Sequence, residues 1–197
     1  MKHGNAITNT VSRHGVGLVE IMVGIAIMGV LLAVAVPSLT GFIERRRVMA
    51  VTDELSSIIA YARSETNAIG DSVTIHLEDD PSNLVSCAAV VTQTLFDICR
   101  CYYAPSQICP VGGGSKMLRL FQLPRSEGVS FRATAASWGA SNQTLTFGRT
   151  SHFRFEQGVS LTVTGQRTGV QLRVDINDAG RARTCSPGGG IAAFPAC

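Results

Sequence analysis

Residues 16–36 read VGLVEIMVGIAIMGVLLAVAV, a run of 21 residues in which Glu20 is the one charged side chain. A helix of about 20 apolar residues is long enough to cross the hydrocarbon core of a bilayer. The run follows a short basic segment that contains Lys2 and Arg13, but no small-residue cleavage site of a secretory signal peptide comes after it. The run therefore predicts a transmembrane helix that the mature chain retains.

A second helical stretch follows this run over residues 37–69. Pro37 lacks a backbone N–H, so we expect it to kink the helix rather than end it, and Gly70 marks the expected end. Apolar residues recur in this stretch at the spacing of one helix face, namely Val51, Leu55, Ile58, Ile59 and Ala62. This pattern predicts an amphipathic helix that packs one face on a folded domain.

The remainder of the chain alternates apolar and polar residues. The alternation covers residues 73–77, 117–121, 159–163 and 170–176, and it predicts antiparallel strands with one buried face and one wet face. The fold class that we predict is α+β. In it, a long N-terminal helix with a membrane half and an amphipathic half packs on an antiparallel β-sheet domain.

The residues at the start of the apolar run resemble the type III signal of type IV pilins and type II secretion pseudopilins. They read Arg13-His14-Gly15, followed by Val16-Gly17-Leu18-Val19-Glu20. The resemblance implies that a prepilin peptidase cleaves after Gly15 and methylates the amine of Val16, where the family usually has Phe. It makes Glu20 the fifth mature residue, whose partner is the N-terminal ammonium of a neighbouring subunit, and Pro37 the family's helix-kinking proline.

Three further segments are similar to the GspH/FimT-like branch of minor pilins and pseudopilins. They are Ala62-Arg63-Ser64-Glu65, residues 145–149 and residues 175–183. The resemblance implies a type IV pilin-like organisation. It consists of a prepilin leader (1–15), a transmembrane and assembly helix (16–36), an amphipathic helix half (37–69) and a periplasmic β domain (70–197) with a Cys-rich insertion (87–114).

The charge is divided unevenly along the chain. Residues 48–115 carry a net charge of −6, whereas residues 116–197 carry +6, an asymmetry that can mark a polyanion partner. In the basic part, Gly180 permits a tight turn. Arg181 and Arg183 are separated by one residue and would project on the same side of an extended segment.

This Gly180-Arg181-Ala182-Arg183 segment resembles the GRxR motif of FimT-like minor pilins that bind extracellular DNA. Four further arginines could extend the surface if turns bring them to the same face: Arg149, Arg154, Arg167 and Arg173. Few aromatic residues lie near them, which favours double-stranded DNA over stacking on single strands. The alternative is a solvated strand edge, on which basic residues discourage edge pairing.

Six cysteines in an exported chain predict disulfides. A bridge between Cys185 and Cys197 would tie down the C-terminal end, and we favour that pair. The other four allow three pairings, between which the sequence does not select: Cys87, Cys99, Cys101 and Cys109. A metal site at Cys99, Cys101 and Cys109 lacks a second paired-ligand motif, so we expect no metal and no cofactor.

The sequence shows no nucleophile elbow and no phosphate-binding loop, so we expect no enzyme activity and no catalytic residue. The predicted function is that of a minor type IV pilin that binds extracellular DNA without sequence preference for uptake in natural transformation. Its expected partners are other pilins, the prepilin peptidase, the inner membrane and double-stranded DNA. Its expected location is the inner membrane with a periplasmic domain, and then the pilus. The alternatives are a pilus-priming minor pilin without DNA binding and a GspH-like minor pseudopilin of type II secretion.

Overall fold

A computed structural model describes most of the chain, with its placed residues at 17–79, 82, 84–92, 99–109, 114–135, 143–148, 158–177 and 179–197. The side chains of residues 34–38 and 79 lie outside this description. The chain divides into two compact units, with the boundary between Thr40 and Gly41. The unit Gly41–Cys197 contains all the strands of the described residues.

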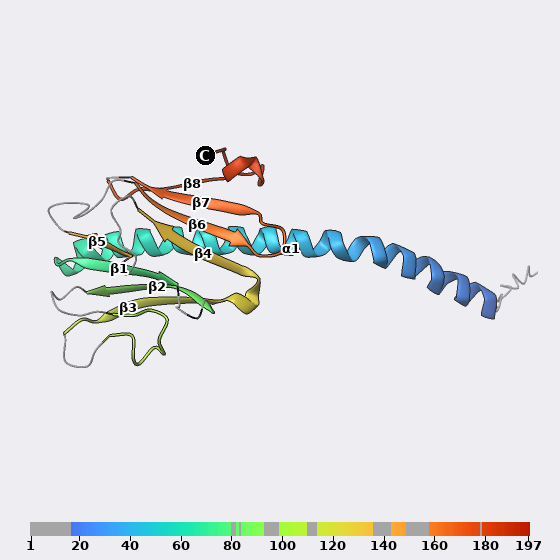
Figure 1. Ribbon diagram of the computed structural model, residues 1–197, viewed down its shortest axis with the longest axis horizontal. Helices are drawn as coiled ribbons and strands as arrows, with labels where there is room; N and C mark the ends of the chain where they lie inside the picture. The colour runs from blue at the N-terminus through green and yellow to red at the C-terminus, as the bar shows by residue number, and fades with distance from the viewer. Residues whose placement is uncertain are drawn as a thin grey trace, which may run out of the picture. The chain divides into compact units, whose positions relative to one another are not determined.

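The elements of the described residues are one long helix, eight strands and two short 3-10 helices (Figure 1). The helix is α1 (Leu18–Ile69), and the 3-10 helices are η1 (Arg125–Glu127) and η2 (Pro187–Gly189). The strands are β1 (Val73–Asp79), β2 (Val85–Thr92), β3 (Met117–Pro124), β4 (Val129–Thr134), β5 (Thr144–Phe147), β6 (Val159–Gly165), β7 (Gln171–Ile176) and β8 (Ala182–Cys185).

The strands form two sheets of four strands each, ordered β3-β2-β1-β5 and β4-β6-β7-β8. Every pairing in the two sheets is antiparallel. Strand β4 links the sheets, because the amide of Phe131 donates to Oγ of Ser86 on β2 at 3.3 Å. The ring of Phe131 also stacks on that of Phe121 of β3, with the ring centroids 6.1 Å apart.

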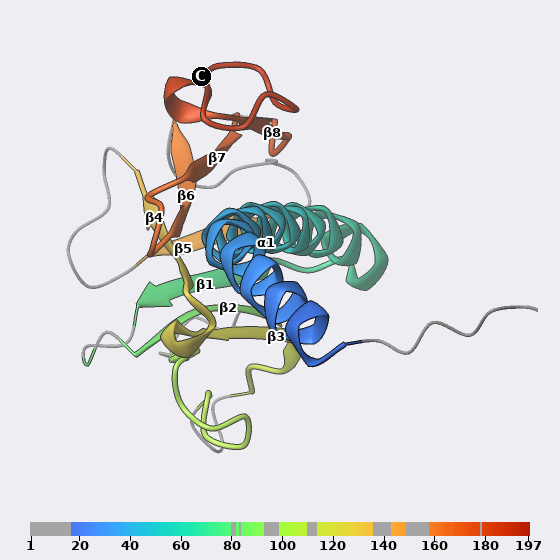
Figure 2. The ribbon, with the colours of Figure 1, turned by 90° about the vertical axis from the view of Figure 1, so that its right-hand side faces the viewer.

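The core forms where both sheets pack on the part of α1 that follows Thr40 (Figure 2). The predicted stripe is confirmed, since its five residues are all buried, and Leu55 and Ile58 are each 1% exposed. The same cluster contains the inward residues of both sheets, for example Ile75 of β1 and Leu172 of β7. One helix face thus supplies the apolar partner for two sheets.

The predicted fold class is wrong in two respects. The strands form two four-stranded sheets, not one sheet, because period-2 patterns show which face of a strand is buried but not which strands pair. The membrane half is also not found, since among the described residues no helix is both long and apolar enough to cross a bilayer.

The Cys-rich segment covers the outer face of the first sheet. Cys87 of β2 is bonded to Cys101, and Cys99 is bonded to Cys109, so the segment 99–109 is held against the sheet. Its buried residues pack on Ala89 and Val91 of β2. The outward residues of β2 beneath this segment are therefore buried along with the inward ones.

His76 of β1 lies buried on this covered face. Burial, assisted by the positive charge of Arg100, lowers the pKa of His76 from 6.5 to about 4. The imidazole is therefore neutral at neutral pH, and its proton uptake is unfavourable in the folded chain.

Glu44 of α1 fastens the helix to the β6–β7 hairpin. Its side chain is buried, and its two carboxylate oxygens accept hydrogen bonds from the amides of Arg167 at 2.7 Å and Thr168 at 3.0 Å. The contact requires glycine at position 165, because a Cβ there would lie 2.7 Å from Oε1 of Glu44. Consecutive loop amides of this kind form a natural cradle for an anion.

The hydrogen bonds from the β6–β7 hairpin lower the pKa of Glu44. Burial is the largest influence and raises the pKa of Glu44, but the hydrogen bonds from Arg167 and Thr168 and the charge of Arg167 together outweigh it. The pKa therefore lies below its usual value of 4.5. A carboxyl whose pKa is lower in the folded state stabilises the fold above its unfolded pKa.

We predict that Glu44→Gln lowers the free energy of unfolding at pH 7 by about 1.5–3 kcal/mol, the range for hydrogen bonds to a charged group. The difference in unfolding free energy between the parent chain and the variant should shrink as the pH falls from 4.5 through the lower folded pKa. Protonation of Glu44 in the parent then removes the stabilisation that the variant lacks. Urea unfolding of the full chain at several pH values measures both effects. The exposed Asp53→Asn on the same helix is the control and should change little. A gap that does not vary with pH would show that the charge of Glu44 is not what stabilises the contact.

Candidate nucleic-acid interface

The turn between β7 and β8 is held by Asn177 and Gly180. The carbonyl of Asn177 accepts from the amide of Gly180 at 2.8 Å, and its side-chain Oδ1 accepts from the amides of Ala179 and Arg181 at 3.1 and 2.9 Å. Gly180 has φ 68°, in the left-handed region that favours glycine. The chain then pairs again in register, with Ala182 opposite Ile176. The turn predicted at Gly180 is confirmed.

Both arginines of the predicted motif lie at this turn and on the strand that follows it. Arg181 directly precedes β8 and Arg183 lies within it, and both side chains are exposed. Neither forms an ion pair with any acid in the part of the chain that the structure describes. The hairpin thus presents two guanidinium groups on an ordered backbone.

Arg183 belongs to the outer face of the second sheet. On β7 the residues Leu172, Val174 and Ile176 are buried, so the alternate positions face outward. Asp175 is paired with Arg183 on one side and with Ser160 on the other. The outward positions of this sheet are polar and include three arginines: Ser130, Arg132, Thr134, Ser160, Thr162, Thr164, Gln171, Arg173, Asp175 and Arg183.

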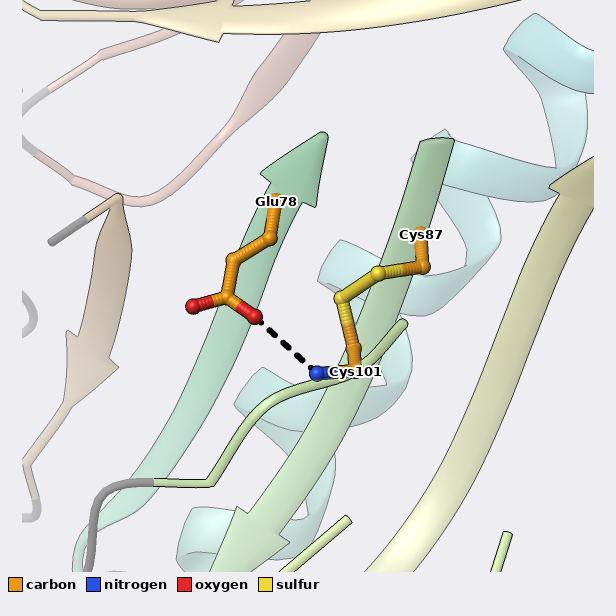
Figure 3. Close-up of side chains that lie close together, drawn as sticks. All are labelled: Glu78, Cys87 and Cys101. Atoms are coloured by element: carbon orange, nitrogen blue, oxygen red, sulfur yellow. Dashed lines mark hydrogen bonds between the residues drawn. A yellow bond between two sulfur atoms is a disulfide. The ribbon is translucent and has the colours of Figure 1, made fainter. Parts of the chain in front are cut away.

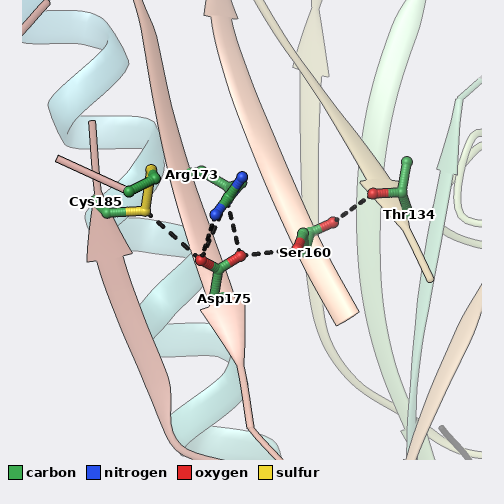
Figure 4. Close-up of polar contacts among 6 residues, drawn as sticks. Thr134, Ser160, Arg173, Asp175 and Cys185 are labelled. Carbon is green, nitrogen blue, oxygen red and sulfur yellow. Dashed lines mark hydrogen bonds and ion pairs between the residues drawn. A yellow bond between two sulfur atoms is a disulfide. The ribbon is translucent and has the colours of Figure 1, made fainter. Parts of the chain in front are cut away.

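Asp175 lies at the centre of this face and forms an ion pair with Arg173 (Figure 4). Nε of Arg173 lies 2.9 Å from Oδ1 of Asp175, and Nη2 donates to Oδ2 at 3.0 Å. The hydroxyl of Ser160 donates to Oδ1 at 2.7 Å. Sγ of Cys185 lies 3.6 Å from Oδ2, but a disulfide sulfur has no proton to donate. Arg173 is therefore less available to an external anion than Arg183.

Of the other predicted arginines, Arg167 lies apart from the motif. It lies on the β6–β7 hairpin, at the opposite end of β7 from Gly180. Strand β7 has six residues, so about 20 Å separates its two ends. Arg149 and Arg154 lie outside the described residues. Among the described residues, the candidate interface therefore consists of Arg181, Arg183 and the polar sheet face beside them.

The predicted processing and assembly residues are placed only in part. Gly15 and Val16 lie outside the described residues, and so does the side chain of Pro37. Glu20 is described and lies exposed in the first turn of α1.

The cysteines form three disulfides in the described residues. Cys185 is bonded to Cys197, the pair that the sequence favours, and this bridge ties the C-terminal end to the last residue of β8. The other two bridges select one of the three pairings that the sequence left open.

One group of side chains has the composition of a metal site. Glu78, Cys87 and Cys101 place a carboxylate oxygen and two sulfurs within 4.8 Å of one another (Figure 3). The sulfurs are joined in a disulfide, so neither is a thiolate that could bind a metal. The carboxylate of Glu78 accepts from Arg100 at 2.7 Å and from the amide of Cys101 at 3.0 Å. These bonds give Glu78 a structural role in fixing the Cys-rich segment.

Sequence reasoning missed Asn177, Asp175 and Glu44. Asn177 was detectable, because Asn is favoured in turns, where its side chain bonds to backbone amides that follow it closely in sequence. Asp175 and Glu44 gave no such signal, since their partners lie on other elements or across the sheet.

Comparisons of the chain with models of protein families, with curated proteins and with solved structures found no match.

We predict that Gly180→Ala lowers the free energy of unfolding by about 1–2 kcal/mol, the cost of placing an L-residue in the left-handed region. Gly41→Ala is the control, and it should raise the free energy of unfolding. It lies within α1, its Cβ would meet the Thr168 methyl at an ordinary 3.9 Å, and alanine favours a helix interior by about 0.5–1 kcal/mol. Urea unfolding of both variants of the full chain measures the difference. A Gly180→Ala chain as stable as the parent would show that the turn does not depend on this conformation.

Proposed function

We propose that this chain is a GspH/FimT-like minor type IV pilin that binds extracellular double-stranded DNA without sequence preference, for uptake in natural transformation. DNA binding is supported by one observation above all, the pair of exposed arginines, Arg181 and Arg183, on the β7–β8 hairpin. Assembly with other pilin subunits is supported by the exposed apolar start of α1.

The start of α1 presents apolar side chains on all sides. Every described side chain from residue 18 to residue 33 is exposed, and Leu18 and Val30 are 73% and 68% exposed. A helix that is apolar all around is normally buried by its surroundings. Like helices of other pilin subunits would supply that cover, and Glu20 would pair there with a neighbour's N-terminal ammonium. Cleavage after Gly15 and residence in the inner membrane before assembly stay predictions from the sequence.

The hairpin suits the phosphates of a DNA backbone. A guanidinium group offers a planar fork of donors that matches two phosphate oxygens, and it is weakly hydrated. Arg181 and Arg183 lie two residues apart, and the hydroxyl of Thr162 on the same sheet can donate a further hydrogen bond. Contacts of this kind bind without reading the bases and weaken as salt rises.

A specific observation also favours the pilus-priming alternative. Strand β8 is an edge of the second sheet, and exposed basic residues on an edge strand discourage pairing with another chain. Under this alternative Arg181 and Arg183 protect the edge, and the domain contacts other pilins alone. The two functions differ in whether the chain binds DNA at all.

We predict that the full chain in neutral detergent binds a labelled DNA duplex, and that Arg181→Gln/Arg183→Gln raises Kd by about tenfold or more. The slope of log K against log salt should become about 2 units shallower, because each lost phosphate contact contributes about 0.9. Fluorescence anisotropy at several salt concentrations measures both quantities, and two unrelated duplex sequences should give the same Kd.

The matched control is Arg63→Gln/Lys116→Gln, which removes the same charge at α1 and before β3. It should leave Kd within about twofold of the parent, because screening at moderate salt confines such effects to nearby charges. Equal weakening by both double variants would assign the binding to net charge and refute the hairpin site. A parent chain that does not bind DNA would favour the priming or secretion alternatives.

A further inference from the structure

A cleft of about 290 Å³ lies at the end of β7 opposite to the Arg181 hairpin. Three segments surround it. They are α1 at Arg45, residues 168–171 at the β6–β7 hairpin, and the loop after β8 at Pro187, Gly188 and Gly190. Of these residues, Gln171 alone also belongs to the polar sheet face of the candidate DNA interface.

The lining of this cleft has the chemistry of an anion site. Arg45 is the one charged residue that lines it, its side chain is exposed, and it pairs with no acid among the described residues. Thr168 and Gln171 also line it. The hydroxyl of Thr168 bonds to Glu44, whereas the side-chain amide of Gln171 donates one hydrogen to Thr164 at 3.3 Å and has a second one free. Much of the remaining wall is glycine, which lets a ligand approach the backbone closely. A guanidinium beside neutral donors favours a phosphate group.

The carboxylate of the preceding residue does not compete for Arg45. Glu44 is adjacent in sequence, but it is buried and both of its oxygens accept hydrogen bonds from the hairpin amides of Arg167 and Thr168. The hairpin thus binds the carboxylate of Glu44 through its backbone and leaves the guanidinium of Arg45 to solvent.

The three walls of the cleft are tied to the rest of the domain. Glu44 fastens α1 to the hairpin. The Cys185–Cys197 disulfide closes the loop that carries the glycines, and the amide of Ile191 donates to Oγ of Ser186 within that loop at 3.0 Å. Ile191 is 7% exposed and belongs to the main core. A preformed site loses less conformational entropy when a ligand binds.

We propose that this cleft binds the phosphate group of a small phosphate ester, with the guanidinium of Arg45 as its charged partner and the second amide hydrogen of Gln171 as a hydrogen-bond donor. The volume lies at the lower limit of small-molecule sites, so it suits a phosphate with a few attached atoms. Such a group is offered both by free phosphate and by the headgroup of a phospholipid.

The test is a titration of the ¹⁵N-labelled full chain in neutral detergent, followed by amide NMR shifts. The probes are inorganic phosphate and glycerophosphoglycerol, a soluble phospholipid headgroup. We expect saturable shifts at Gly169, Gly188 and Gly190. Arg45→Gln should weaken binding by about tenfold or more, and Arg45→Lys should weaken it less, because lysine keeps the charge but not the fork of donors.

Arg46→Gln is the matched control, since Arg46 lies next in the helix and its guanidinium sits over the ring of Phe42, 5.2 Å from its centroid. Binding should be unchanged in this variant. Tighter binding of glycerophosphoglycerol than of phosphate would assign the site to lipid headgroups, and equal binding would assign it to free phosphate. Equal weakening by Arg45→Gln and Arg46→Gln, or no saturable shift with either probe, would overturn the proposal.

Discussion

The fold of residues 41–197 depends on one apolar stripe of α1, whose residues Val48, Leu55, Ile58 and Ala62 are almost wholly buried. Both four-stranded sheets bury their inner faces against this stripe. Each sheet therefore has one outer face that the stripe does not cover, and the two outer faces differ in what covers them. The Cys-rich segment covers the outer face of the first sheet, whereas that of the second is polar and carries the arginines. The candidate interface follows from this difference in covering.

Strand β7 connects the two basic features of the domain. At its start, the β6–β7 hairpin binds the buried carboxylate of Glu44 and borders the cleft at Arg45. At its end, the turn built on Asn177 and Gly180 presents Arg181 and Arg183. Asp175 neutralises the arginine between them, Arg173. Among the described residues, these two basic features therefore lie at opposite ends of one strand.

Local patterns in the sequence predicted local structure well. The 3.6-residue spacing located the buried stripe of α1, and the Gly180 turn and the Cys185–Cys197 bridge involve residues close together in the chain. The division into two sheets depends on strand pairing, which period-2 patterns do not encode. The same holds for Glu44 and Asp175, whose roles depend on partners that folding brings to them. The membrane half was predicted from the apolar run over 16–36, and the described residues contain no helix that meets the requirement.

Contact between DNA and the β7–β8 hairpin is tested most directly by hydrogen exchange of the full chain with and without a DNA duplex. Strand β8 is an edge strand, so part of its backbone faces away from β7 and exchanges readily unless a ligand covers it. If DNA contacts this hairpin, exchange slows in residues 177–185 when DNA is bound and stays unchanged in the Cys-rich segment 99–109. Protection of the segment 99–109, with none at 177–185, would contradict this contact.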